Sequence, residues 1–395
     1  MSAGRRTRIL IVDDSAVMRS LLRSVVSTDA GLEVCGTAAD GASALSSLGV
    51  VRPDLVLLDV EMPVMDGLAT LRELRKRGHK MPVIMCSSLT QRGAQVTVEA
   101  LASGASDYVA KPSGQSNREA AVRALGQELG PKIHALTHQD VALGQGAPVS
   151  ARAVLGSPVF PGSAVFPGPG RSPLLAPLAP PQRGQAIQAN PTALVIGVST
   201  GGPAALDVLL PALPANFPLP VMIVQHMPEL FTKLLAERLD GRSKLRVREA
   251  AEGDAVRPGT ILIARGNWHM EIVAAARGGA PHTLRLNQGP MENHCRPAVD
   301  VLFRSAAAVY GPGTLAVVLT GMGSDGLVGC RMIRELGGTV LAQDQASSTV
   351  WGMPGAVTLA GLAHRVLGLH DIAPEILRLA SRTHNEAREL RESAV

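Results

Sequence analysis

Short apolar runs rich in Val, Ile and Leu recur along most of this 395-residue sequence, and most of them are followed by a segment of helical periodicity. Runs of this kind are typical of strands buried on both faces, and their alternation with helices is typical of parallel α/β sheets. One long interruption, where Pro, Gly and Ala dominate, divides the alternation into two blocks. The sequence therefore predicts two doubly wound, mostly parallel α/β domains joined by a linker.

We place four segments along the chain: a first domain at residues 1–130, a flexible linker at 131–190, a second domain at 191–385 and a charged tail at 386–395. Charges nearly vanish in the linker, and its many Pro and Gly residues favour extended or irregular backbone. Such a stretch is not expected to bury a core of its own. We therefore expect the chemistry to lie in the two domains.

Composition and charge exclude several classes of protein. Aromatic residues make up only 2% of the chain, and the net charge of +5 comes from scattered basic residues, so we expect no nucleic-acid binding. The four cysteines form no Cys-x-x-Cys pair, which argues against a disulfide framework or a zinc site and favours a reducing compartment. No signal peptide or membrane-length apolar run is recognisable. These observations predict a cytoplasmic protein without direct membrane insertion.

Charged and hydroxyl side chains follow the predicted strands of the first domain. Asp13 and Asp14 end its first strand, Asp59 its third, Ser87 its fourth and Lys111 its fifth. The carboxyl ends of parallel strands meet at one edge of a sheet, where converging carboxylates repel one another unless a cation such as Mg²⁺ joins them. A carboxylate can also accept a phosphoryl group, whose oxygens a lysine and a serine would hold. Any one of these acids could instead cap a helix, but the set predicts a site for Mg²⁺ and a phosphoryl group.

One stretch of the second domain joins a buried strand to a helix through a serine. The apolar run Ala193–Val198 leads into Ser199. Gly201 and Gly202 then let the backbone turn, and Pro203 suits the first turn of a helix. The spacing Gly-x-Ser-x-Gly is typical of a nucleophile elbow, in which a serine oxygen projects from a strand-to-helix turn. A Gly-rich turn without chemistry is the alternative interpretation.

Two further strands of this domain lead to a histidine and an aspartate. His226 follows the run Val221–Gln225, and Asp325 lies in a Gly-rich loop after Leu315–Leu319. With Ser199 they supply an alcohol, an imidazole that takes its proton and a carboxylate that orients the imidazole. Their order along the chain differs from that of lipases and other α/β-hydrolases. We predict that the three side chains meet at the carboxyl edge of the sheet.

Alternatives to two members of this triad stay open on the sequence pattern. His269 and His294 are competing bases, because each lies in a loop with Gly or Asn nearby. Glu252 and Asp254 are competing acids, and Asp325 could merely cap the following helix. Glycines beside the predicted nucleophile and acid allow backbone amides to form an oxyanion hole, one donor of which contributes about 3–4 kcal/mol to transition-state stabilisation.

The first domain resembles the receiver domain of response regulators over nearly its whole length. The matching stretches are Leu10-Ile-Val-Asp13-Asp14-Ser, Leu58-Asp59-Val-Glu-Met-Pro63-Val-Met-Asp66-Gly67 and Lys111-Pro112. The resemblance implies a flavodoxin-like fold in which Asp59 is the phosphoryl acceptor and a histidine kinase is the phosphodonor. It also implies that Asp13, Asp14 and Asp59 hold the Mg²⁺ that phosphorylation requires.

The same resemblance assigns roles at the last two strands of the domain. It implies that Ser87 is the switch hydroxyl, although the family often has Thr there, and that Lys111 contacts the phosphate. Tyr108 takes the position of the family's switch aromatic residue. The family's Lys–Pro bond is typically cis, which makes Lys111–Pro112 the candidate here, since X–Pro is where cis bonds occur.

The second domain resembles chemotaxis-type protein-glutamate methylesterases between about residues 192 and 379. The matching stretches are Ile196-Gly-Val-Ser199-Thr200-Gly-Gly, Val224-Gln-His226-Met-Pro228, Leu319-Thr-Gly-Met322-Gly-Ser-Asp325-Gly326, Ala342-Gln-Asp344 and Gly352-Met-Pro354. The resemblance implies a Rossmann-like esterase domain with Ser199 as nucleophile, His226 as base and Asp325 as orienting acid. It places Thr200 and Met322 near the oxyanion site. Two departures are Ala298, where the family often has Ser, and a linker longer than usual.

Together the two resemblances imply a serine hydrolase that is activated by phosphorylation. It would remove methyl esters from glutamate side chains, and deamidate glutamines, on the cytoplasmic helices of chemoreceptors. The esterase chemistry would need no cofactor, and the unphosphorylated receiver would cover the crevice that contains Ser199. The alternative is a response regulator with a non-catalytic or DNA-binding output domain, for which a helix-turn-helix with a basic recognition helix would be needed.

Overall fold

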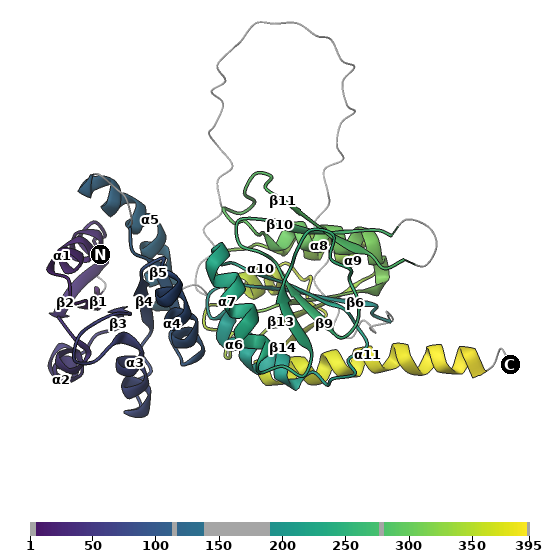
Figure 1. Ribbon diagram of the computed structural model, residues 1–395, viewed down its shortest axis with the longest axis horizontal. Coiled ribbons are helices and arrows are strands. Elements are labelled where there is room, and N and C mark those ends of the chain that lie inside the picture. Colours follow the sequence, from purple (N-terminus) through teal and green to yellow (C-terminus); the bar gives the residue numbers. More distant parts are fainter. Residues whose placement is uncertain (1–4, 113–116, 138–189, 276–279, 393–395) are drawn as a thin grey trace, which may run out of the picture.

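Two α/β domains lie side by side, each built around a parallel sheet (Figure 1). The computed structural model describes residues 5–112, 117–137, 190–275 and 280–392. Most of the predicted linker therefore lies outside the described residues. Within them, no helix combines the length and the apolar character needed to cross a membrane.

The first domain alternates strands and helices as the sequence predicts. Its elements are β1 (Thr7–Val12), α1 (Ala16–Ser27), β2 (Leu32–Ala38), α2 (Gly41–Val51), β3 (Leu55–Asp59), α3 (Gly67–Lys76), β4 (Val83–Ser87), α4 (Gln91–Ala102), β5 (Asp107–Ala110) and α5 (Arg118–Thr137). The five strands pair in the order β2-β1-β3-β4-β5, and every pairing is parallel. This order is the flavodoxin-like one, so the predicted fold of the domain is confirmed.

Helix boundaries in this domain follow local side-chain chemistry. The side chains of Ser15, Asp40, Asp66 and Thr90 each accept a backbone N–H at the start of a helix, which satisfies a donor that the helix itself leaves free. Helix α5 continues to Thr137, so the limit that we place at residue 130 falls inside it. Within the described residues the cis peptide bond is Arg296–Pro297, so the prediction of a cis Lys111–Pro112 bond was wrong.

The second domain contains a larger parallel sheet and a separate hairpin. Its elements are β6 (Ala193–Val198), α6 (Gly202–Leu209), η1 (Leu210–Ala212), β7 (Val221–Gln225), α7 (Glu229–Asp240), β8 (Arg246–Glu249), β9 (Thr260–Ile263), β10 (His269–Val273), β11 (Thr283–Asn287), α8 (Val299–Tyr310), η2 (Gly311–Gly313), β12 (Thr314–Val318), α9 (Leu327–Glu335), β13 (Thr339–Gln343), α10 (Met353–Leu359), β14 (Arg365–Leu367) and α11 (Leu369–Glu392). Seven parallel strands run in the order β14-β13-β12-β6-β7-β9-β8, and β10 pairs with β11 in antiparallel fashion.

Strand β6 lies in the middle of the larger sheet, between β12 and β7. All of its residues are buried, as are those of its two neighbours, which agrees with their apolar sequences. Helix α8 crosses close to β6 at Gly197, where a Cβ atom would lie 2.3 Å from Cγ1 of Val299. The loops that follow β12, β6 and β7 therefore start close together at one edge of the sheet, over which α8 is tightly packed.

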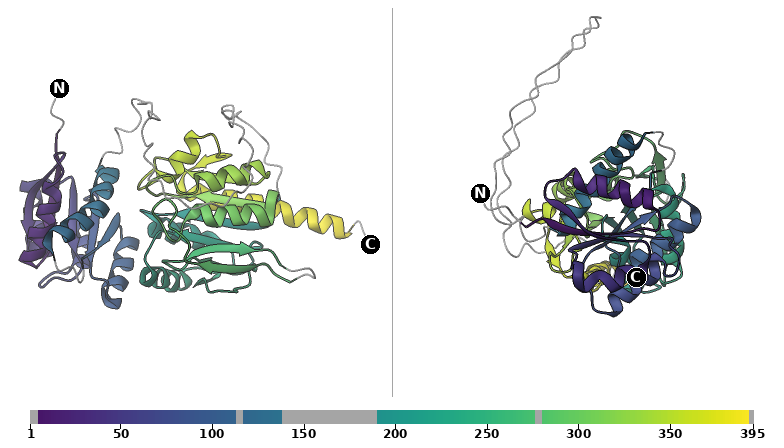
Figure 2. Two further views of the ribbon diagram at one scale, coloured as in Figure 1. Left: turned by 90° about the horizontal axis from the view of Figure 1, so that it is seen from above. Right: turned by 90° about the vertical axis from the view of Figure 1, so that its left-hand side faces the viewer.

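The two domains share an apolar interface. Helix α4 of the first domain packs against α6 and α7 of the second, while α11 extends away on the opposite side (Figure 2). The rings of Tyr108 and Phe231 stack with their centroids 4.6 Å apart. Met322 and Val350 of the second domain pack on the apolar cluster of the first. The receiver-like domain is therefore seated on the second domain with Tyr108, the predicted switch aromatic, inside the contact.

Candidate active site

The turn after β6 presents Ser199 at the carboxyl edge of the sheet. The strand ends at Val198, and α6 begins at Gly202, so the serine lies between a buried strand and a helix. Gly201 has φ +78°, and a Cβ atom there would lie 2.3 Å from the Thr349 hydroxyl oxygen. A residue with a side chain would meet both backbone strain and a steric clash at this position. The structure thus has the strand–turn–helix form that the Gly-x-Ser-x-Gly spacing predicts.

His226 directly follows β7, the strand that pairs with β6, and so lies level with Ser199 at the edge of the sheet. Gln225 pairs with Val198 in the sheet, and the amide of His226 donates to the Val198 carbonyl over 3.1 Å. The Gln225 side chain also donates to the Ser199 carbonyl over 3.0 Å. These bonds fix the two loops against each other, so Ser199 and His226 begin at adjacent points of the same edge.

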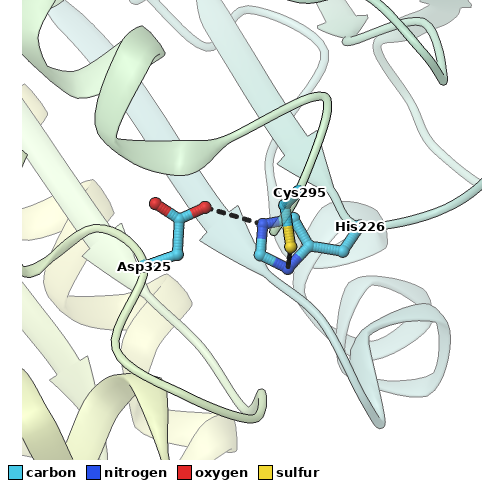
Figure 3. Close-up of side chains that lie close together, drawn as sticks. All are labelled: His226, Cys295 and Asp325. Carbon is cyan, nitrogen blue, oxygen red and sulfur yellow. Dashed lines mark hydrogen bonds and ion pairs between the residues drawn. The ribbon is translucent and has the colours of Figure 1, made fainter. Parts of the chain in front are cut away.

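Asp325 reaches the imidazole from the other side of β6, on the loop between β12 and α9. Its Oδ2 lies 2.8 Å from His226 Nε2 and also accepts the Val299 amide over 2.7 Å (Figure 3). Its Oδ1 accepts the amides of Asp300 and Gly326. Burial alone would raise the pKa of Asp325, but these hydrogen bonds outweigh it and lower the pKa below its usual range. The carboxylate is therefore ionised and cannot rotate freely.

The second nitrogen of His226 contacts a cysteine that the sequence analysis did not single out. Nδ1 lies 3.5 Å from Sγ of Cys295 (Figure 3). Burial favours neutral imidazole, but the hydrogen bonds to Asp325 and Cys295 outweigh it and raise the pKa of His226 to about 9. Within the described part of the chain, the Ser199 hydroxyl makes no hydrogen bond to His226. The predicted base and acid are thus joined, and the nucleophile lies beside them without that contact.

A cavity of about 670 Å³ opens between the two domains over this group of side chains. Ser199, His226, Thr200 and Met322, all predicted site residues, line it. The first domain forms part of its wall through residues that include Asp107 and Tyr108. The predicted nucleophile therefore faces a space that the receiver-like domain partly encloses.

Thr200 makes a direct hydrogen bond across the domain interface. Its hydroxyl donates to Oδ2 of Asp107 over 2.6 Å, and both residues are buried. Lys132 Nζ lies 3.4 Å from Oδ1 of the same carboxylate and donates to the Tyr108 carbonyl over 2.5 Å. A charged acceptor from the first domain is thus fixed against a residue next to Ser199. The sequence analysis missed Asp107, and an acidic residue in an otherwise apolar strand was the available signal.

The residues that the sequence left open as alternative bases and acids make contacts of other kinds. His269 is buried and bonds the Pro290 carbonyl and the Ala298 amide, which is a structural role. His294 is exposed and lines the cavity, but within the described residues it makes no hydrogen bond to an acid. Asp254 accepts Arg248 and a turn amide, and Glu252 accepts the Leu286 amide. None of these four residues bonds to His226 in the described structure.

A second acidic group lies at the carboxyl edge of the first sheet. Carboxylate oxygens of Asp13, Asp14 and Asp59 lie within 4.8 Å of one another. Lys111 Nζ lies 2.9 Å from Asp13 and 2.7 Å from Asp59. Burial raises the pKa of Asp59, and Lys111 opposes that shift. Carboxylate oxygens grouped in this way fit the ligand preference of Mg²⁺.

Ser87 ends β4, the strand that pairs with β3, which ends at Asp59. Its side chain is fully buried, accepts a hydrogen bond from the Thr97 hydroxyl over 2.7 Å and donates to the Ser88 carbonyl over 3.1 Å. The structure therefore brings Asp13, Asp14, Asp59 and Lys111 together as predicted, with the Ser87 hydroxyl engaged by its own neighbours.

Comparison with known proteins gives consistent results for both domains. The family model described as CheB methylesterase matches residues 194–376, and the one described as response regulator receiver domain matches residues 9–123. A Nocardioides protein named protein-glutamate methylesterase/protein-glutamine glutaminase is 48% identical over 375 residues, which are 95% of this chain and 96% of that protein. A Trichodesmium erythraeum protein of the same name is 44% identical, covering 94% of this chain and 98% of that protein. A crystal structure of the Thermotoga maritima CheB methylesterase catalytic domain is 44% identical, covers 48% of this chain and 98% of that chain, and has a TM-score of 0.46.

Proposed function

This chain belongs to the CheB methylesterase family, with a response regulator receiver domain in front of its catalytic domain, and we propose that Ser199, His226 and Asp325 carry its chemistry. It is a protein-glutamate methylesterase and protein-glutamine glutaminase, in line with the names of its relatives. Those relatives give no support to a DNA-binding or non-catalytic output domain. The observation that carries the residue assignment is the 2.8 Å hydrogen bond between buried Asp325 and half-buried His226, beside the strand end that bears Ser199.

In the proposed mechanism, the neutral form of His226 takes the hydroxyl proton of Ser199 while Oγ attacks the γ-carbonyl carbon of a glutamyl methyl ester. Because the pKa of His226 is raised to about 9, the share of this form grows as the pH rises towards that value. Nε2 faces Asp325, so Nδ1 is the nitrogen that takes the proton. His226 then gives this proton to the departing methanol, and water hydrolyses the acyl-enzyme. A glutamine side chain follows the same route with ammonia as the leaving group. The scheme uses these three side chains and water and calls for no cofactor.

This first step requires His226 Nδ1 to turn from Cys295 towards Ser199. Ser199 and His226 directly follow Val198 and Gln225, which pair in the sheet. A movement of the His226 side chain would therefore be enough, and the sheet need not rearrange. Such hydrogen bonds are often long in free enzymes and tighten when substrate binds. Backbone amides near Thr200 and Met322, which both line the cavity, are the proposed donors to the oxyanion.

The receiver domain is proposed to hold the enzyme closed until Asp59 is phosphorylated. The Asp107–Thr200 hydrogen bond and the Tyr108–Phe231 stack support this closed state. Both receiver residues lie on β5, and Lys111, which contacts Asp59, follows directly after that strand. A change at Asp59 therefore has a short structural route to the interface, and it would shift the population towards an open arrangement.

A receiver domain implies Mg²⁺-dependent phosphorylation in general, and we assign the ion to Asp13, Asp14 and Asp59. When bound, Mg²⁺ neutralises charge on the phosphoryl group during its transfer. Asp59 would supply the accepting oxygen, and Lys111, which already contacts Asp59, would contact the phosphoryl oxygens. The Ser87 hydroxyl, which here donates to the Ser88 carbonyl, would have to turn to join it. We infer that a histidine kinase is the phosphodonor and that methylated cytoplasmic helices of chemoreceptors are the substrate, which places the enzyme in the cytoplasm.

Substitution of the nucleophile tests this assignment. Ser199→Ala should abolish methanol release from a methylated receptor fragment, while Asp59 still accepts phosphate from a small phosphodonor. Ser324→Ala is a matched control, because Ser324 is an exposed serine on the same loop as Asp325, and it should keep the wild-type rate. A Ser199→Ala enzyme that retained most of its esterase rate would refute the nucleophile assignment.

A further inference from the structure

Cys295, His226 and Asp325 form a second arrangement of nucleophile, base and acid. It shares His226 and Asp325 with the proposed triad of Ser199. Its Sγ lies 3.5 Å from His226 Nδ1, and His226 Nε2 lies 2.8 Å from Asp325 (Figure 3). The half-buried thiol also lines the cavity that contains Ser199. Two nucleophilic side chains therefore face one space and depend on the same imidazole nitrogen.

Hydrogen bonds hold the loop that carries Cys295 in its position beside His226. Glu292 and Cys295 exchange two backbone hydrogen bonds, of 3.1 and 2.8 Å. The Asn293 side chain donates to Oδ1 of Asp325 over 2.9 Å, so the loop is tied to the acid itself. Asn293 and His294 both have positive φ, of 51° and 62°, a conformation that costs energy for residues other than Gly. The surrounding contacts thus hold the thiol in place against the preference of the backbone.

The other cysteines lack this environment. The chain has four, all within the described residues, and Cys295 is the one that contacts an imidazole nitrogen. Cys86 and Cys330 are fully buried, and burial raises the pKa of each thiol well above its usual range. Cys35 is half-buried, and burial also raises its pKa. Burial thus protects Cys86 and Cys330. Cys35 and Cys295 are both half-buried, but in the described structure only Cys295 has a neighbouring base.

We propose that Cys295 is a covalent modification site for small soft electrophiles, peroxides in particular, and that its modification switches off the esterase. Nδ1 of neutral His226 takes the thiol proton as Sγ attacks the electrophile, which is how a thiol is activated by an adjacent base. The added group then occupies the face of the imidazole that Ser199 needs. This consequence for catalysis rests on the proposed function, whereas the reactivity of the thiol does not.

The step with hydrogen peroxide balances without a further reactant. Sulfur attacks one peroxide oxygen, an S–O bond forms and the O–O bond breaks. Sulfur is oxidised by two electrons to a sulfenic acid, and the peroxide is reduced. The departing hydroxide takes the proton that His226 received from the thiol and leaves as water. Small thiols reverse this first oxidation stage, so the modification can act as a switch.

The test measures alkylation of the full-length protein by iodoacetamide at one fixed pH, with the modified cysteine identified by mass spectrometry. A positioned base typically contributes 10²–10⁴-fold to proton transfer, so His226→Gln should slow the alkylation of Cys295 at least tenfold. Alkylation of Cys35 in the same sample is the internal control and should not change, because Cys35 contacts no histidine in the described structure. Equal rates at Cys295 with and without the imidazole would overturn the proposal.

A second measurement links modification to activity. Methanol release by the wild-type enzyme should fall in step with the fraction of Cys295 that peroxide has converted to sulfenic acid, and dithiothreitol should restore it. Whatever rate Cys295→Ala retains should be insensitive to peroxide. If Cys295 is modified while methanol release continues, the switch is refuted but the esterase assignment stands. If Ser199→Ala retains esterase activity, the nucleophile assignment fails, while the alkylation result still decides whether the thiol is activated.

Discussion

Breaking the hydrogen bond between Asp107 and Thr200 should raise esterase activity without phosphorylation. The Asp107 carboxylate belongs to the receiver and accepts the Thr200 hydroxyl over 2.6 Å in a buried setting. Asp107→Ala removes the acceptor but leaves Lys132 paired, since Lys132 also donates to the Tyr108 carbonyl over 2.5 Å and lies 3.2 Å from Glu128. The substitution should therefore weaken the closed state without leaving an isolated buried charge.

The size of the effect follows from the kind of bond that is lost. A hydrogen bond to a charged group contributes about 1.5–3 kcal/mol. At 1.4 kcal/mol for each factor of ten, its loss shifts the ratio of closed to open enzyme by roughly ten- to a hundredfold. The basal rate should rise by the same factor as long as the closed form predominates. Asp107→Asn keeps a neutral hydrogen bond and should give a smaller rise, roughly fivefold.

The assay is methanol release by the unphosphorylated full-length enzyme. Glu128→Gln is the matched control, because Glu128 pairs with the same lysine but makes no hydrogen bond to the catalytic domain within the described residues. It should stay near the wild-type basal rate. An Asp107→Ala enzyme that keeps the wild-type basal rate, yet is activated normally by a phosphodonor, would show that this bond does not hold the enzyme closed.

Two further predictions concern the catalytic domain. The pKa of His226 is raised in the folded protein to about 9, so its protonated form stabilises the fold fully below about pH 6.5, and this contribution is lost as the pH rises through about 9. Urea unfolding should therefore give a falling free energy of unfolding over that window, and a smaller fall in Asp325→Asn. Gly321→Ala would place a methyl group 2.8 Å from Cβ of Ser199 and should lower kcat by roughly a hundredfold through misplacement of the nucleophile. Gly241→Ala makes only an ordinary contact and should leave kcat unchanged, and equal rates for the two variants would contradict this reasoning.

The order of strands and helices could be predicted because each buried strand has its own apolar run. Strand β14 is harder to predict, because it has only three residues, two of them exposed, and so lacks a buried apolar run. Strands β8 and β9 follow each other along the chain and yet pair in parallel, which neither of their short sequences indicates. Helix α5 runs past Pro131, and the buried side chains of Ile133 and Leu136 explain why it does not end there.

Only those site residues that lie at or just after the end of a recognisable strand could be predicted from the sequence. Ser199 and His226 do so, and Asp325 lies in the Gly-rich loop after a third. The contacts that surround them depend on loops from distant parts of the sequence. Thr200 and Asp107 are 93 positions apart and in different domains, and Cys295 is 69 positions from His226. No periodicity or local spacing encodes such pairings, because they arise from how whole loops and domains pack.

In the proposed closed state, the receiver and the substrate would compete for the surface around the cavity between the two domains, and coupling of this kind acts in both directions. If phosphorylation raises the affinity for substrate by some factor, bound substrate must raise the affinity of the Asp59 site for Mg²⁺ and a phosphoryl analogue by the same factor. A densely methylated receptor array would then recruit the open form and make Asp59 easier to charge. Phosphorylation at Asp59 would then depend on the methylation level of the receptors as well as on the kinase.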